Sequence, residues 1–219
     1  LLGRVEQANE NYSKALEIFQ KCHGIIQILY KGKDHPSLIT CKINFGECFT
    51  DMGAYDLAEQ YIKEAIAIST RLFHEKHHTI IPCYQEMGRL FSKQKKFDKA
   101  IDMDRKCLGL TLSEYGAESF EAKSIHKMFG EIYNESGDFY VAIRCFSSVK
   151  GINRKLYGED NDFLVQDLVN LAHEYGELRD GIQEIEHLKL AVTVAQGNFL
   201  QKKLKFDRVY KDFLVNDLV

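Results

Sequence analysis

The sequence predicts an all-α chain built from stacked helical hairpins. Three observations support this: the 219 residues include only two prolines, no stretch alternates apolar and polar residues as a strand does, and small and aromatic residues recur every 42 positions. A period of this length is typical of solenoids, in which each hairpin buries its apolar stripe against the next one. The expected fold is an antiparallel helix-hairpin solenoid, a right-handed superhelix with a long concave face.

The 42-residue period appears in several registers at once. The members of three registers are Gly46, Gly88, Gly130 and Ala172; Ala58, Ala100 and Ala142, followed by Glu184; and Phe49, Phe91, Tyr133 and Tyr175. Glycine inside a helix costs about 1 kcal/mol relative to alanine. Three glycines at equivalent places therefore indicate an offsetting gain, which the close approach of two helix backbones would supply.

Apolar residues three and four positions apart define the helices. Four hairpins are expected, at 36–51 with 55–73, 78–93 with 97–114, 119–135 with 139–156, and 162–177 with 181–196. A lone second helix over about 4–29 opens the chain, and a lone first helix over about 200–217 closes it. The whole chain, 1–219, is then one array that consists of a truncated repeat (1–30), four full repeats (31–73, 74–115, 116–157 and 158–196) and a capping or partial repeat helix (197–219).

The two ends of the chain depart from the period. At the start, three small residues match three others at an offset of 50, which suggests seven extra residues in the opening helix: Gly3, Ala8 and Ala15 against Gly53, Ala58 and Ala65. At the other end, one apolar stripe at helical spacing is expected to cap the stack: Phe206, Val209, Tyr210, Phe213 and Leu214.

The pattern Gly46-x2-Phe49, followed by Ala58, Tyr61-Ile62 and Ala65, resembles the signature of tetratricopeptide repeats. The 42-residue period, with "GKDHPSL", "GAYDLAEQYIKEAIAI" and "LVNLAHEYG", is similar to the kinesin-light-chain type. The resemblance covers nearly the whole chain and is best in residues 29–73. It implies a scaffold that binds a peptide segment of a partner in a groove lined by the first helices.

By register, the resemblance implies that polar residues on the first helices line this groove. They are Asn44, Glu47 and Asp51; Gln85, Arg89 and Lys93; Lys127, Glu131, Asn134 and Glu135; and Asn170, His173 and Glu177. Asn44 and Asn170 match the asparagine that often holds a ligand backbone in such repeats, whereas Glu86 and Met128 depart from it.

Along the expected groove the charge alternates from acidic to basic to acidic. Glu47 and Asp51 precede Arg89 and Lys93, and Glu131 with Glu135 follows. One reading is that these groups pair with one another between neighbouring hairpins, each exposed pair contributing well under 1 kcal/mol. The other is that they receive a mixed-charge peptide with an acidic feature over Arg89 and Lys93.

The stretch from Gly32 to Pro36 has the look of a small site, with an acid and a histidine beside a glycine. One repeat later the same places hold His74 to His78, so the place recurs while the chemistry changes. We interpret these segments as connectors, in which Gly32 ends one helix, Asp34 or His35 caps the next, and proline fits its first turn. A zinc site of three histidines from this region with Cys83 is the less favoured alternative.

Composition excludes several classes of function. A formal net charge of -3 lacks the basic surface of a nucleic-acid-binding protein, and no apolar run reaches the roughly 18 residues that would insert into a membrane. The six cysteines fall in apolar helical patterns, which indicates free core thiols and a reducing, cytoplasmic compartment. No catalytic motif is present, so we expect neither an enzyme nor a cofactor or metal. The absence of an initial methionine suggests a piece of a longer protein.

The leading hypothesis is thus a non-enzymatic scaffold or adaptor that binds a protein or peptide partner within a larger protein or complex. The likeness to light-chain repeats sharpens this to microtubule-motor transport, a cilium or another cytoskeletal assembly. The alternative is a structural spacer in a permanent complex that uses its convex or terminal faces.

Overall fold

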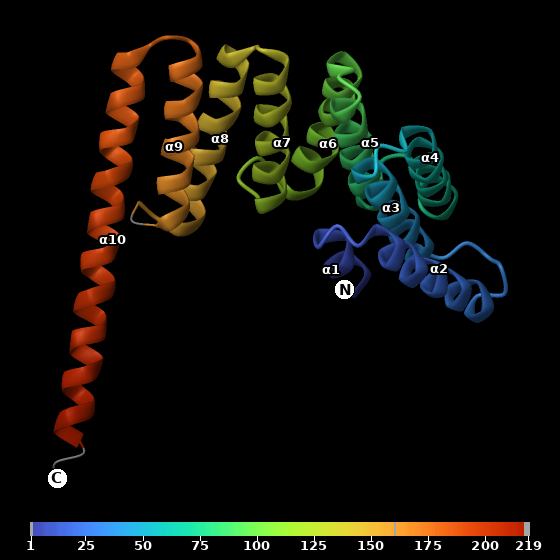
Figure 1. Cartoon of the computed structure of the whole chain (residues 1–219), viewed down its shortest axis with the longest axis horizontal. Helices are drawn as coiled ribbons and strands as arrows, with labels where there is room; N and C mark the ends of the chain where they lie inside the picture. The colour runs from blue at the N-terminus through green and yellow to red at the C-terminus, as the bar shows by residue number, and fades with distance from the viewer. Residues whose placement is uncertain (1, 160, 217–219) are drawn as a thin grey trace. The chain divides into compact units, whose positions relative to one another are not determined.

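The computed structural model describes the backbone of residues 2–159 and 161–216 and the side chains up to residue 198, and this part contains helices and no strands. The helices, shown in Figure 1, are α1 (Leu2–Ala8), α2 (Tyr12–Leu29), α3 (Pro36–Asp51), α4 (Tyr55–Leu72), the 3-10 helix η1 (His78–Ile80), α5 (Ile81–Lys93), α6 (Phe97–Tyr115), α7 (Phe120–Ser136), α8 (Phe139–Tyr157), α9 (Asp162–Glu177) and α10 (Gly181–Asn216). The all-α helix-hairpin fold class is therefore confirmed. None of the described helices is long and apolar enough to cross a membrane.

The chain divides into two compact units, Leu1–Ala117 and Glu118–Val219. Unit 1 contains α1 to α6, in which α3 pairs with α4 and α5 with α6. Unit 2 contains α7 to α10, which run side by side in sequence order (Figure 1). Each unit thus consists of antiparallel hairpins, and their membership of one continuous array remains a prediction.

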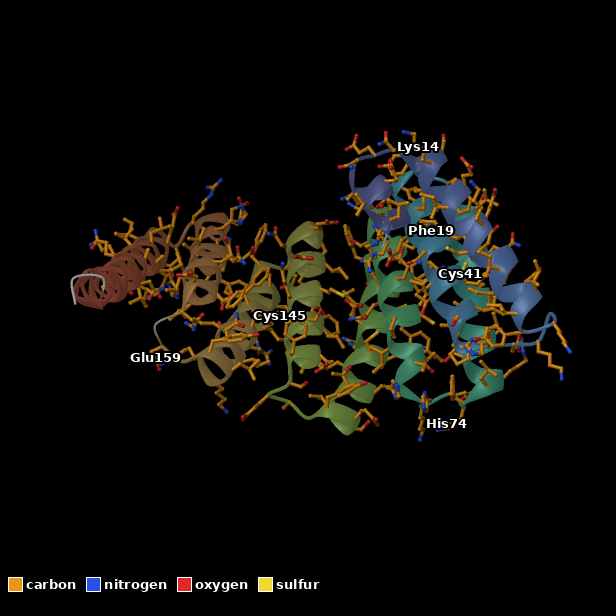
Figure 2. All side chains as sticks on the ribbon, turned by 90° about the horizontal axis from the view of Figure 1, so that it is seen from below. Lys14, Phe19, Cys41, His74, Cys145 and Glu159 are labelled. Atoms are coloured by element: carbon orange, nitrogen blue, oxygen red, sulfur yellow. The ribbon has the colours of Figure 1, made fainter. Side chains whose placement is uncertain are left out.

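Within each unit, the hairpins share their apolar core with the next hairpin. In unit 1, Phe19 of α2 packs with Phe45 of α3, their ring centroids 5.8 Å apart, and Cys41 lies in the same contact (Figure 2). In unit 2, Phe146 of α8 packs with Leu171 of α9. A hairpin therefore completes its neighbour's core, which is the property that the 42-residue period predicts.

The glycines of the repeated register lie under a side chain of the second helix. A Cβ atom built on Gly46 would lie 2.6 Å from Ile62 Cγ1, and one on Gly130 would lie 2.7 Å from Phe146 Cζ. The backbone carbonyl of Ala58 is farther from the Gly46 position, at 3.6 Å. The gain that offsets glycine in these helices is thus mainly room for a bulky side chain, and the expected backbone approach is secondary.

The prediction of one opening helix over about 4–29 was wrong. Two helices occupy this segment, and the turn between α1 and α2 contains Glu10 in the left-handed region, at φ 61°. The segment therefore includes the end of a first helix as well as a complete second helix.

The seven-residue insertion proposed for this segment is also wrong. A Cβ on Gly3 would lie 2.4 Å from Phe19 Cε1, so Gly3 is the structural counterpart of Gly46 and Phe19 that of Ile62. Both pairs are 43 residues apart in the sequence. The match of Gly3 with Gly53 was a coincidence of small residues, and the opening repeat has nearly the normal period.

At the other end, α10 runs unbroken from Gly181 to Asn216. The separate helix predicted over about 200–217 is therefore part of a single 36-residue helix. Gly197 does not adopt a positive φ and no proline follows, so nothing in the local sequence stops the helix. The apolar side chains predicted to cap the stack lie outside the described residues.

Asp104 is an unexpected residue in the core of unit 1. It is fully buried on α6, at the register of Ile62 and Phe146, and Gly88 lies beneath it. Neither of its carboxyl oxygens has a hydrogen-bond partner among the described residues. Burial raises the pKa of Asp104 to about 7, because the charged form is poorly solvated there.

We predict that Gly46→Ala lowers the free energy of unfolding by about 1–3 kcal/mol, because the new methyl group would overlap Ile62. The matched control is Gly24→Ala in the interior of α2, where nothing lies within 4 Å of the added atom. That change should stabilise the chain by up to about 1 kcal/mol. Urea unfolding of both variants measures the two values, and equal effects would contradict the packing role of Gly46.

Asp104 should make the stability depend on pH. The pKa of Asp104 is about 7 in the folded state, against 3.8 for an ordinary aspartate. Between these two pH values the carboxyl group is protonated in the folded state and ionised in the unfolded state. The stability of the wild type relative to Asp104→Asn should then fall by about 4 kcal/mol between pH 4 and pH 8. Urea unfolding at several pH values tests this, and a constant difference between the two proteins would refute it.

Candidate functional site

The residues predicted to line a groove do lie on the first helices. In unit 1 they fall on α3 and α5, and in unit 2 on α7 and α9. The half-buried members are Asn44, Glu47, Gln85, Arg89, Asn134 and Asn170, and the exposed members are Asp51, Lys93, Lys127, Glu131, Glu135, His173 and Glu177. We call these surfaces the first-helix face of each unit.

Arg89 is the centre of the first-helix face of unit 1. Its Nη1 donates to Asp51 Oδ1 at 2.7 Å, and its Nε and Nη2 donate to the two carboxyl oxygens of Glu86 at 2.9 and 2.8 Å. Nη2 also reaches the backbone carbonyl of Glu47 at 3.1 Å. The guanidinium therefore joins α3 to α5 and has two carboxylate partners.

Two further residues extend this group, which we call the Arg89 cluster. Thr50 Oγ1 lies 2.8 Å from Gly46 O and 3.1 Å from Glu86 Oε1, so these two acceptors share its single proton, and Gln7 Nε2 of α1 donates to Asp51 Oδ2 at 2.7 Å. The cluster thus connects α1, α3 and α5. It consists of Gln7, Thr50, Asp51, Glu86 and Arg89.

Burial decides how the charges of the cluster behave. Glu86 is only 5% exposed, and this burial raises the pKa of its carboxyl group although the hydrogen bonds from Arg89 act in the opposite direction. Burial disfavours the Arg89 cation, but its bonds to Glu86 and Asp51 outweigh this and raise the pKa of Arg89. Asp51 and Arg89 therefore pair with each other between neighbouring hairpins, as one of the two readings of the alternating charge expects. Sequence reasoning missed Glu86 as a partner, and its only signal was a glutamate at the expected asparagine position.

Two amides and one ammonium group are among the side chains of this face that have no hydrogen bond or ion pair within the described part of the chain. They are the half-buried amides of Asn44 and Gln85 and the exposed ammonium of Lys93. Their helices are fixed to each other by the Arg89 cluster. Two amides and one cation therefore remain available on a surface whose backbone is held in place.

In unit 2 more of the polar side chains on the first-helix face bind one another or neighbouring residues of the unit. Asn134 Nδ2 donates to Glu174 Oε1 at 2.7 Å, which connects α7 to α9. Gln166 donates to Asn170 Oδ1 at 2.9 Å, and Lys127 lies 3.7 Å from Glu131. Two of the predicted ligand-binding asparagines thus already serve as internal partners.

The corner at Gly32 to Pro36 is a connector, as the sequence predicts. Gly32 has φ 72°, and Ser37 N donates to His35 Nδ1 at 3.2 Å, which makes His35 the N-cap of α3. Asp34 pairs with Arg71 at 2.7 Å, and this hydrogen bond lowers the pKa of Asp34. The apparent chemistry of this stretch is explained by helix capping.

The histidine segment that follows has a similar role. His77 Nδ1 accepts from Thr79 N at 3.3 Å and caps η1, while Cys83 is buried in the core. In the part of the chain described by the structure, no three histidine, cysteine, aspartate or glutamate side chains are grouped so that they could hold a metal ion. All six cysteines are free, four of them buried, but Cys22 is exposed and so departs from the predicted core position.

The comparison with known families decides the identity of the repeats. The model described as "Tetratricopeptide repeat" matches residues 1–71 and, again, 43–113, which together make up more than half of the chain. The chain belongs to the tetratricopeptide repeat family. Proteins with these repeats are generally interaction scaffolds, and this chain is a repeat scaffold of that class.

A curated relative is similar to half of this tetratricopeptide repeat chain. The "Clustered mitochondria protein homolog" of Candida albicans is 30% identical over 111 residues, which are 48% of this chain and 8% of that protein. The matched segment is therefore a small part of a much longer relative.

Solved structures show the same fold over most of the chain. BtubC (BKLC) from P. vanneervenii has a TM-score of 0.74 at 18% identity and covers 90% of this chain and 78% of its own. The putative kinesin light chain repeats of Podospora anserina reach 0.72 at 16% identity, covering 89% and 92%. A Rap protein complexed with Competence and Sporulation Factor reaches 0.67 at 15% identity, covering 89% and 52%. The tetratricopeptide repeats of this chain thus share the fold of kinesin-light-chain-like repeats.

We predict that Arg89→Gln lowers the free energy of unfolding by about 3 kcal/mol, because Glu86 is left buried without its cation. Adding Glu86→Gln should recover part of this loss, since no buried charge then remains. The control Lys93→Gln, on the exposed side of the same helix, should change stability by less than about 0.5 kcal/mol. Chemical denaturation of the three variants measures these effects, and a tolerated Arg89→Gln would show that the cluster is not structural.

Proposed function

We propose that the chain is an adaptor that captures an extended segment of a partner protein on the first-helix face of unit 1. The observation that carries this proposal is the set of unpartnered polar groups of Asn44, Gln85 and Lys93 on two helices fixed by the Arg89 cluster. An amide side chain has both a donor and an acceptor, so it can bind the backbone of an extended peptide. The proposed ligand is therefore a peptide held through its main chain.

The rigid spacing of these groups supports capture. The Arg89 guanidinium joins α5 to α3 through two acceptors on α3, Asp51 Oδ1 and Glu47 O, so the free amides on both helices have a fixed separation before a partner arrives. A binding surface that is already ordered loses less conformational entropy on association. The Arg89 cluster thus acts as a positioning element for the proposed site.

The charge of the partner follows from what the cluster leaves free. Arg89 is compensated by Asp51 and Glu86, so an acidic feature of a partner would face Lys93 alone. The carboxylate of Glu47 is half-buried on the same face and forms no ion pair with any described residue, so it favours a donor or a basic group of the partner. We therefore propose a mixed-charge segment, with its acid near Lys93.

The similarities support a broader setting for this adaptor. One structural neighbour is complexed with a factor, others are kinesin light chain repeats, and the Candida albicans relative has a name that refers to mitochondrial clustering. We propose a role in a cytoplasmic assembly linked to motors or to organelle positioning. These similarities favour such an assembly over a ciliary one.

The second candidate is a structural spacer within a permanent complex. The observation in its favour is that several polar residues of the first-helix faces are used internally, such as Asp51 by Arg89 and Asn134 by Glu174. In this case the first-helix faces would stabilise the repeats, and other surfaces would make the contacts. The two candidates differ in whether the free groups of unit 1 matter for partner binding.

The test compares protein capture by face variants with capture by a matched control. Lys93→Glu and the double change Asn44→Ala and Gln85→Ala should each reduce capture of at least one partner about tenfold or more in quantitative affinity purification, a loss of about 1.4 kcal/mol. The control is Lys14→Glu, the same charge change on the exposed surface of α2 (Figure 2). Equal capture by all four proteins, with folding intact, would favour the spacer.

A further inference from the structure

A second surface, in unit 2, has the properties of a binding groove. It lies between the start of α8 and the turn that joins α9 to α10. Its lining includes Tyr140, Ile143, Arg144, Leu178, Arg179 and Ile182. We call it the turn-edge groove, and it shares no residue with the first-helix face of unit 2.

The walls of this groove are large apolar side chains that the fold leaves in solvent. Tyr140 and Ile182 are each 72% exposed, while Ile143 and Leu178 between them are half-buried. Two exposed large apolar side chains beside two half-buried ones form an apolar patch, and such patches are a feature of interaction sites.

The repeat itself shows that these two residues do not serve helix formation. Tyr140 and Ile182 occupy one register, which holds Asp56 and Asp98 in the first turns of α4 and α6 and Ser13 in the first turn of α2. An acid there is favourable, because it interacts with the positive end of the helix dipole. Unit 2 has replaced this acid twice with an exposed apolar side chain, which gives up a local stabilising interaction. A contact with another molecule would account for the change.

Two cations complete the groove. Arg144 and Arg179 are both exposed, and neither has a hydrogen bond or ion pair from its side chain to any described residue. The one acid of the lining, Asp180, accepts a hydrogen bond from Gln183 N at 3.2 Å and so caps α10. The available charge of the groove is therefore positive.

The turn that contains Arg179 has the same backbone conformation as its counterparts in the other repeats. Arg179 has φ 59°, in the left-handed region, at the register that holds Gly53 and Gly137 and also Lys95, whose φ is 59°. Glycine adopts this conformation without strain, so Arg179→Gly would remove the side chain and keep the turn.

The corresponding groove of unit 1 lacks the arginines of the turn-edge groove. It is lined by residues 53–57 with Gln94 and Lys96. Repeat geometry thus creates a hollow in both units, and Tyr55 and Leu57 give the hollow of unit 1 an apolar lining as well. That lining contains no arginine, however, and has Asp56 where unit 2 has Tyr140. The chemistry of the turn-edge groove is a property of its residues and not of the fold.

We propose that the turn-edge groove binds a short peptide segment of a partner protein in which a large apolar side chain is flanked by carboxylates. The apolar side chain would fit between Tyr140 and Ile182 above Leu178, and the carboxylates would pair with Arg144 and Arg179, whose planar guanidinium groups favour bidentate contacts. This site is separate from the proposed function, because it uses another unit and other residues.

The experiment uses the whole chain and a defined library of nine-residue peptides. Each peptide has a central Leu, Phe or Trp flanked by Asp and Glu, and two matched libraries replace the acids by Asn and Gln or the central residue by Ala. Fluorescence anisotropy should detect binding of acidic apolar peptides, at least tenfold weaker binding of both matched libraries, and weaker binding at 500 mM salt than at 50 mM.

Three variants test the site without endangering the fold. Tyr140→Asp and Ile182→Asp restore the acid found in unit 1, and Arg179→Gly gives the turn its preferred residue, so each should fold at least as well as the wild type. Each should weaken peptide binding tenfold or more, whereas Lys14→Glu should not. The proposal is overturned if no library peptide binds below about 1 mM, or if Lys93→Glu removes the binding while the groove variants retain it.

Discussion

The structure depends on one steric relation that recurs in four hairpins, from α1–α2 to α7–α8, in which a side chain of the second helix rests on a glycine of the first. Ile62 lies over Gly46, Phe146 over Gly130 and Phe19 over Gly3. This contact brings the two helices of a hairpin together and aligns the apolar stripe that the next hairpin covers. Each first helix packs its apolar side into the core, so its remaining surface can bear polar residues.

The same relation explains why polar residues in the core stand out. Asp104 takes the place of Ile62 in its hairpin, so a carboxyl group lies where a hydrocarbon side chain would fit. Glu86, by contrast, is buried with a bidentate arginine and a threonine hydroxyl. Asp104 is thus unpartnered, whereas Glu86 has hydrogen-bond partners and connects α5 to α3 of the preceding hairpin.

The sequence predicted the helices of the four hairpins and their shared core, because the 42-residue period records packing that every hairpin must repeat. Corners such as Gly32 to Pro36 were also predictable, since capping depends on adjacent residues. The opening turn at Glu10 was missed, because a non-glycine residue in the left-handed region has no sequence signature. The partner choice of Arg89 was also beyond prediction, since it depends on whether Glu86 is buried and on how far apart α3 and α5 lie.

The unbroken α10 extends well beyond the helix it packs against. At 1.5 Å per residue its 36 residues extend about 54 Å, whereas the 16 residues of α9 extend about 24 Å. About 30 Å of α10 therefore has no counterpart along α9. The apolar contact of Ala191 with Leu164 and Leu168 and the hydrogen bond from Asn198 to Asp162 hold α10 against α9. Beyond them, the backbone of α10 continues without the neighbouring helix that α4 and α8 have along their length.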